Sequence, residues 1–154
     1  MNTNDEKPGA GPGAGSFTGT GTGMGTGTSH GSAGTGALLD HEKLVVYRVA
    51  REFLVVATRL SKRKIPAELR DQFERASMSI LFNIGEGAGK TARADKQRSY
   101  EIARGSTTEA ATQLDVIRIR EHISEEEFQH ARELLVRIAQ MLSRLCGPPR
   151  VRKP

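Results

Sequence analysis

The stretch SEEEFQHARELLVRIAQMLSRLCGPP, residues 124–149, carries the clearest structural signal in this chain of 154 residues. Ser124 suits a helix N-cap, and Glu127 three residues later completes a capping box. Apolar residues then recur at spacings of three and four, which places them on one helical face: Phe128, Ala131, Leu135, Ile138, Leu142 and Leu145. Gly147 and the two prolines after it are typical of a helix end. An amphipathic helix is therefore predicted between Ser124 and Gly147.

Three more helices are predicted upstream. One runs from about His41 to Ser61, and its inward face is Val46, Val49, Ala50, Phe53, Ala57 and Leu60. A second begins at Pro66 with the stripe Leu69, Phe73, Ala76, Ile80 and Ile84. Its later half should be buried, because from Met78 onward apolar residues surround it. The third starts between Thr91 and Asp95 and continues to about Glu121, with Ala103, Ala110, Leu114 and Ile117 facing inward.

Four amphipathic helices joined by short loops predict an all-α protein, an antiparallel up-down four-helix bundle. Within the third helix, Gly105 stands beside Ser106, Ala110 and Ala111. A glycine in mid-helix costs about 1 kcal/mol relative to alanine. We therefore expect a packing reason for Gly105, such as the close approach of another backbone.

Composition divides the chain into three parts. The first 36 residues hold 12 of the 17 glycines and almost no large apolar side chains. Such a segment buries too little apolar surface to offset the entropy cost of ordering. We predict a disordered Gly/Thr-rich arm at 1–37, the bundle at 38–147 and a basic C-terminal tail at 148–154.

Charge and cysteine content bear on location and partners. The net charge is +5, which weakly favours RNA or DNA. No apolar stretch is long enough to span a membrane, and the polar N-terminus resembles no export signal. Cys146 is the only cysteine, so an internal disulfide is excluded. These features predict a cytoplasmic protein without a membrane partner.

The stretch GEGAGKT, residues 85–91, resembles a nucleotide-binding P-loop but does not fit its spacing. That motif requires a glycine five residues before the Gly-Lys-Thr, and Ile84 stands there. A P-loop also follows a strand, whereas residues 75–84 continue a helical pattern. We interpret Gly85, Gly87 and Gly89 as the end of a helix and a turn.

In the same stretch, Glu86 follows the most apolar part of the second helix, with Asn83 one turn before it. A buried carboxylate needs a partner. We therefore expect Glu86 to pair with an arginine, with Arg75, Arg104 or a residue of another subunit as candidates.

No catalytic or metal-binding constellation is predicted. Glu127 and His130 form one Glu-x-x-His pair, but di-iron bundles need two such pairs. The other histidines lack ligand spacing. The expectation is a protein that is not an enzyme and has no metal and no cofactor.

Basic residues gather in three clusters, which are the candidates for nucleic-acid contact: Arg59, Lys62, Arg63 and Lys64; Lys90, Arg93, Lys96 and Arg98; Arg150, Arg152 and Lys153. In an up-down bundle the second and third clusters lie at the same end. Aromatics for base stacking are scarce, so contact should be to backbone phosphate and without sequence choice.

The first helix also has a second apolar strip, which needs a cover: Leu44, Tyr47, Leu54 and Val55. One alternative is therefore a scaffold that binds a protein partner and has no nucleic-acid role.

Two motifs in the middle of the chain resemble a known family. They are QFERASMSILFNIGEG, residues 72–87, and ARGSTTEAATQL, residues 103–114. Both are similar to the small four-helix-bundle proteins encoded in intervening sequences of bacterial 23S rRNA genes, the S23 ribosomal protein family. The matching positions include Asn83, Glu86, Gly87, Gly105, Ser106 and Glu109. The family usually has a proline where this chain has Leu81, so the kink that this proline implies is not expected here.

The family is similar in fold to the accessory variability protein of diversity-generating retroelements. The resemblance implies a homopentamer with a basic surface that associates with nucleic acid, as an accessory to a nucleic-acid enzyme. It implies no catalytic residue. It also gives the strip of Leu44, Tyr47, Leu54 and Val55 a use as an oligomer interface.

Overall fold

The computed structural model describes residues 36–147. The arm predicted at 1–37 lies outside this range except for Gly36 and Ala37, and the tail predicted at 148–154 lies outside it entirely. The described residues form four helices and no strand: α1 Val45–Leu60, α2 Ala67–Gly89, α3 Arg93–Ile119 and α4 Glu125–Cys146. The all-α fold class predicted from periodicity is confirmed.

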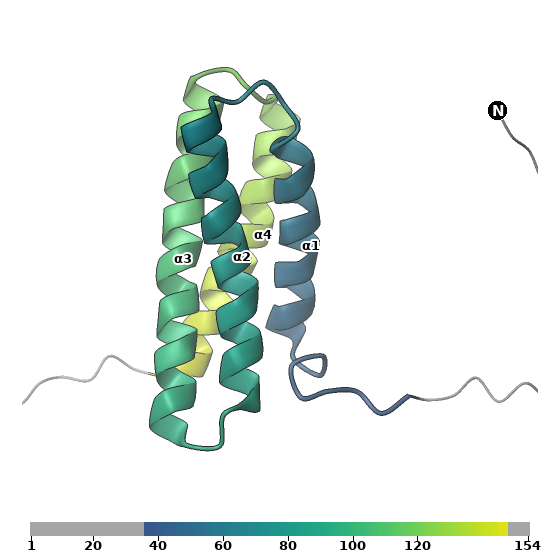
Figure 1. The fold of residues 1–154 in the computed structure, drawn as a ribbon, viewed down its shortest axis with the longest axis vertical. Coiled ribbons are helices and arrows are strands. Elements are labelled where there is room, and N and C mark those ends of the chain that lie inside the picture. Colours follow the sequence, from purple (N-terminus) through teal and green to yellow (C-terminus); the bar gives the residue numbers. More distant parts are fainter. Residues whose placement is uncertain (1–35, 148–154) are drawn as a thin grey trace, which may run out of the picture. The chain divides into compact units, whose positions relative to one another are not determined.

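The four helices form an antiparallel up-down bundle (Figure 1). Each helix packs against its two neighbours in a closed ring, α1 on α2, α2 on α3, α3 on α4 and α4 on α1, and α2 with α3 makes the most extensive pair. The connections at 61–66 and 120–124 lie at one end, here called the upper end. The connection at 90–92 lies at the other, the lower end, where α1 begins and α4 finishes.

The predicted inward stripes fill the space between the helices. Phe53 of α1 and Phe73 of α2 are fully buried, and their rings meet edge to face at 6.2 Å. Two expectations of burial are wrong. Met78 and Phe82 of α2 are exposed, because they lie opposite the buried Ile80 and Ile84 stripe. Leu145 is exposed as well, and Cys146 is buried in its place at the end of α4.

Two helix ends differ from the predicted bounds. α1 begins at Val45, later than the predicted His41, because residues 39–44 form turns closed by bonds from the Glu42 amide to the Leu39 carbonyl and from the Leu44 amide to the His41 carbonyl. α2 runs on through Gly85 and Gly87 and ends at Gly89, so of the three glycines only Gly89 stands at a helix end. Lys90 then turns to an extended conformation.

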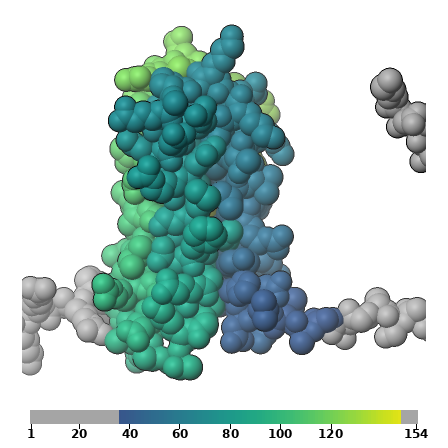
Figure 2. Space-filling view, viewed as in Figure 1, coloured from purple at the N-terminus to yellow at the C-terminus, as the bar shows by residue number. Residues whose placement is uncertain are grey.

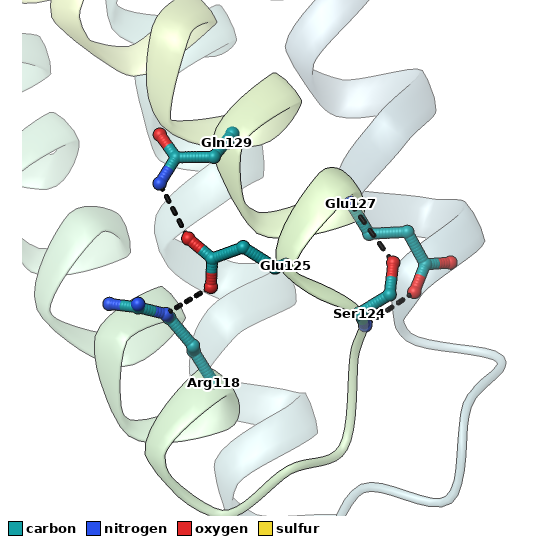
Figure 3. A network of polar contacts seen from close by, with 5 residues as sticks. All are labelled: Arg118, Ser124, Glu125, Glu127 and Gln129. Carbon is teal, nitrogen blue, oxygen red and sulfur yellow. Dashed lines mark hydrogen bonds and ion pairs between the residues drawn. The ribbon is translucent and has the colours of Figure 1, made fainter.

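The ends of α4 match the prediction. The hydroxyl of Ser124 accepts a hydrogen bond from the Glu127 amide at 3.2 Å, and the Glu127 carboxylate accepts one from the Ser124 amide at 2.9 Å (Figure 3). This is the capping box expected from the sequence. At the other end, Gly147 has a φ of 71°, a backbone conformation that favours glycine.

Candidate nucleic-acid interface

One group of cations lies at the lower end, around the connection from α2 to α3. This lower basic cluster consists of Lys90, Arg93, Lys96 and Arg98. Lys90 pairs with Glu86 one turn earlier, with its Nζ 2.7 Å from the carboxylate. Within residues 36–147, Arg93 and Arg98 form no ion pair, and both are exposed. Two guanidinium groups are therefore available to an anion from solution.

The backbone at this place also favours an anion. α3 begins after Ala92, whose side chain offers no cap, so no side chain at that position accepts from the first amides of the helix. Uncapped amides and the helix dipole both attract negative charge. Asp95 in the first turn weakens this field. Arg93 and Arg98 lie within the first two turns of the same helix.

A second group, the upper basic cluster, consists of Arg59, Lys62, Arg63 and Lys64 at the connection from α1 to α2. Arg63 forms an ion pair with Glu127 of α4. The Ser124 amide and the Arg63 guanidinium both hydrogen-bond to the Glu127 carboxylate and lower its pKa, the amide bond most strongly.

Acids gather at the same upper end, because α4 begins with three glutamates. The Glu125 carboxylate accepts bonds from Gln129 and Arg118, both at 2.7 Å, which Figure 3 shows beside the capping box. Both bonds lower the pKa of Glu125, and the bond from Gln129 has the larger effect. The upper end is thus of mixed charge.

The third cluster, Arg150, Arg152 and Lys153, lies outside the described residues. The preceding helix α4 finishes at the lower end (Figure 1). At the end of α4, burial raises the pKa of the Cys146 thiol. The positive charge of Arg104 on α3 opposes this rise, and the negative charge of Glu101 adds to it. The chain therefore enters its basic tail at the end that holds the lower basic cluster.

Two of the residues that carry the family resemblance, Gly87 and Ser106, lie at the contact between α2 and α3. The hydroxyls of Ser79 and Ser106 are hydrogen-bonded across the two helices at 2.8 Å. The Asn83 amide donates to the Ser79 carbonyl at 2.8 Å and to its hydroxyl at 3.1 Å, which fixes the serine in place. On α3, the Glu109 carboxylate accepts from Gln113 at 3.3 Å. Asn83 and Ser106 thus act in packing.

Gly87 explains a close approach between the same two helices. A Cβ at this position would stand 2.6 Å from Cε1 and 2.9 Å from Cδ1 of the Tyr100 ring. Tyr100 is buried, and burial raises the pKa of its phenol. The packing reason expected at Gly105 is absent within the described residues, because a Cβ there would meet nothing within 4 Å.

Within the chain, the expected pairing of a buried Glu86 with Arg75 or Arg104 is wrong. The Glu86 side chain is exposed and pairs with Lys90, on its own helix. The reason is geometric: Glu86 follows the buried Ile84 by two residues, which turns it about 200° around the helix.

The four interface candidates lie in three different surroundings. Leu44 lines an apolar groove of about 220 Å³ between α1 and α4, here called the α1–α4 groove, with Val45, Val46, Met141, Arg144 and Leu145. Tyr47 already packs inside the chain. The centre of its ring is 4.5 Å from that of His41, edge to face, and a Cβ added at Gly85 would stand 3.7 Å from the Tyr47 ring. Leu54 and Val55 line another groove, between α1 and α2.

That second groove includes residues that the sequence argument missed. The α1–α2 groove has a volume of about 440 Å³ and is lined by Leu54, Val55, Leu81, Arg51, Arg59 and Lys62, with Thr58. Arg51 was not among the candidates. The spacing of Arg51, Val55 and Arg59 puts all three on one side of α1, and Lys62 follows in the turn after the helix, a signal that the sequence does contain.

Among the described residues, no group of three or more His, Cys, Asp or Glu side chains has the arrangement of a metal site. None of the four helices has the length and apolar character needed to cross a membrane. Together, the fold and the polar contacts define an up-down four-helix bundle in which the hydroxyls of Ser79 and Ser106 join α2 to α3.

The family follows from comparison with known proteins. The family model described as 23S rRNA-intervening sequence protein matches residues 42–144. The chain therefore belongs to the 23S rRNA-intervening sequence protein family. The crystal structure of a protein of unknown function from the S23 ribosomal protein family of Bacteroides thetaiotaomicron has the same fold, with a TM-score of 0.64 and 24% identity over 68% of this chain and 100% of that one. No curated protein matches this chain.

Proposed function

We propose that this chain is a non-catalytic, self-associating cytoplasmic bundle that binds RNA or DNA without sequence selection, as an accessory to a nucleic-acid enzyme. The observation that carries this proposal is the exposed pair Arg93 and Arg98 on the uncapped start of α3. α4 finishes at the same end of the bundle, and Arg150, Arg152 and Lys153 follow it in the sequence. The name of the family, which refers to 23S rRNA, supports a nucleic-acid context.

The chemistry of the cluster favours phosphate over bases. Arginine guanidinium groups bind phosphate oxygens in a bidentate manner, and helix-start amides add further donors. Such contacts fix a nucleic acid in place without reading its sequence. The upper basic cluster takes no part in this proposal, because Arg63 is paired and the glutamates of α4 lie at that end.

Reversing the charge of the lower basic cluster is expected to weaken RNA binding. For an unstructured 20-nucleotide RNA probe, the Arg93→Glu/Arg98→Glu variant should bind at least about tenfold more weakly in fluorescence anisotropy. The slope of log affinity against log salt should also flatten by about 1.4, since each phosphate contact on a single strand contributes about 0.7.

The matched control is Arg132→Glu/Arg137→Glu, which reverses two exposed arginines on the outer side of α4. It changes the net charge by the same amount and should leave most of the affinity. Equal weakening by both pairs would mean that only net charge matters, and this interface would be withdrawn.

Self-association is assigned to the α1–α4 groove, since Arg144 is the only charged residue among those that line it and the others are apolar. Val45 is 53% exposed, which leaves apolar surface for a second copy to cover. The resemblance to the pentameric accessory protein supplies the expected number of subunits, five.

Light scattering after size exclusion, at micromolar concentration, is expected to give a pentamer for the parent and a monomer for Val45→Glu. Ile119→Glu is the control, because Ile119 is 77% exposed at the end of α3 and lies outside the groove. A monomeric parent, or equal dissociation by both variants, would contradict the assignment.

A further inference from the structure

The α1–α2 groove combines an apolar floor with a cationic rim. Leu54, Val55 and Leu81 supply its apolar surface, here called the floor, and Arg51, Arg59 and Lys62 supply its cations, here called the rim. The groove opens on the face where α1 and α2 lie side by side toward the viewer in Figure 2. It is far from the lower basic cluster, because Arg59 and Lys62 are at the upper end of the bundle.

The apolar surface extends beyond the floor along α2. Val55 is 59% exposed and Phe82, which follows Leu81, is 65% exposed. Met78 lies one turn before Leu81 and is exposed too. Large apolar side chains gathered on one face of a helix pair are typical of a surface that another molecule covers.

The three cations have no partner in this part of the chain. Among the described residues, Arg51, Arg59 and Lys62 form no ion pair. Two acids lie nearby along the helices, Glu52 on α1 and Glu74 on α2, and neither comes within 4.0 Å of a basic group. The rim therefore presents a net positive charge to whatever fills the groove.

From this arrangement we infer that the α1–α2 groove binds an acidic amphipathic helix of a protein partner. Apolar side chains at helical spacing fill the floor, and glutamates or aspartates on both sides of that stripe meet the three cations. A helix laid into a groove between two helices is a common mode of peptide recognition. Charge of the opposite sign selects the partner and orients it.

Two other occupants fit less well. RNA could use the three cations through its phosphates, but the apolar side chains of Leu54, Val55 and Leu81 would then stay uncovered. A second copy would have to present an acidic face. The outer side of α4 carries Glu126 and Glu133, but Arg132 and Arg137 on the same side cancel their charge.

Selection from a random library of helical peptides, with the full-length protein as target, tests this inference without a preconceived sequence. Enriched peptides should carry apolar residues at three- and four-residue spacing and an excess of acids. The best of them should bind Arg51→Glu/Lys62→Glu at least about tenfold more weakly than the parent. Arg51→Gln/Lys62→Gln should show a smaller loss in the same direction. The control Arg132→Glu/Arg137→Glu should bind as the parent does.

Circular dichroism checks that these variants keep their helices, which their exposed positions favour. Three results would overturn the inference: enriched peptides without acidic excess, a best peptide that binds the groove variant as well as the parent, or loss of self-association in that variant with peptide binding intact. RNA binding at the lower end is measured separately. The peptide site in the α1–α2 groove can therefore be disproved while the nucleic-acid proposal stands, and the nucleic-acid proposal can be disproved while the peptide site stands.

Discussion

Replacing Gly87 by valine is expected to lower the free energy of unfolding by about 3 kcal/mol, near the upper part of the usual range for overpacking. The first added carbon would already stand 2.6 Å from the Tyr100 ring and 3.2 Å from Cβ of Ser99. A buried aromatic ring cannot move aside as the tip of a lysine would. α2 and α3 would have to separate at their closest pairing, and urea denaturation would measure the loss.

Gly105→Val is the matched control, since it places the same side chain in a helix where a Cβ would meet nothing within 4 Å. Its effect should stay within about 0.5 kcal/mol, because valine and glycine differ little in helix propensity. In a double-mutant cycle, Tyr100→Ala should make Gly87→Val less harmful than in the parent, since removal of the ring makes room. Equal losses at Gly87 and Gly105 would show that the close approach is not the cause.

This pair of glycines illustrates what the sequence could and could not predict. Both lie in motifs that resemble the same family, and sequence reasoning expected a close approach at Gly105. The structure places it at Gly87, against Tyr100. Which glycine meets a neighbour depends on how α2 is shifted along α3. That shift is a property of two helices together, so the periodicity of either one alone does not contain it.

The parts of the fold that follow from local rules were predicted well. The capping box at Ser124, the buried stripe of α4 and the up-down order depend on spacing within one helix and on short loops. Expectations about burial at the ends of helices were less accurate. Leu145 and Cys146 are adjacent, and only the fit of α4 against its neighbours decides which of them is covered.

Charged residues show the same division. The lower basic cluster was predicted from its place at a turn, and its residues lie around the connection from α2 to α3 in the structure. Glu86 was predicted to be buried because its neighbours in sequence are apolar, yet direction around the helix matters more than neighbours. The α1–α2 groove could not be predicted from α1 alone, because Leu81 of α2 completes a surface that begins on α1.

Phe53→Ala is expected to have the largest effect on stability of the changes considered, a loss of about 3–5 kcal/mol in the free energy of unfolding. Phe53 is fully buried, and its ring packs edge to face against Phe73 at 6.2 Å. The substitution removes the burial of a whole ring and leaves a cavity in the centre of the bundle. The melting temperature should fall by about 10–20 °C, as expected for a domain near 110 residues.

Phe82→Ala is the control, because it removes the same ring from a position that is 65% exposed on α2. In a single chain its effect should be within about 0.5 kcal/mol. The protein concentration then adds a second reading. A second copy of the chain that covered Phe82 would stabilise the folded state by mass action, so a loss that grew with concentration would place self-association on this face and not at the α1–α4 groove. A loss for Phe82→Ala that is large at every concentration would mean that the ring packs within its own chain, which would contradict its place on the exposed side of α2.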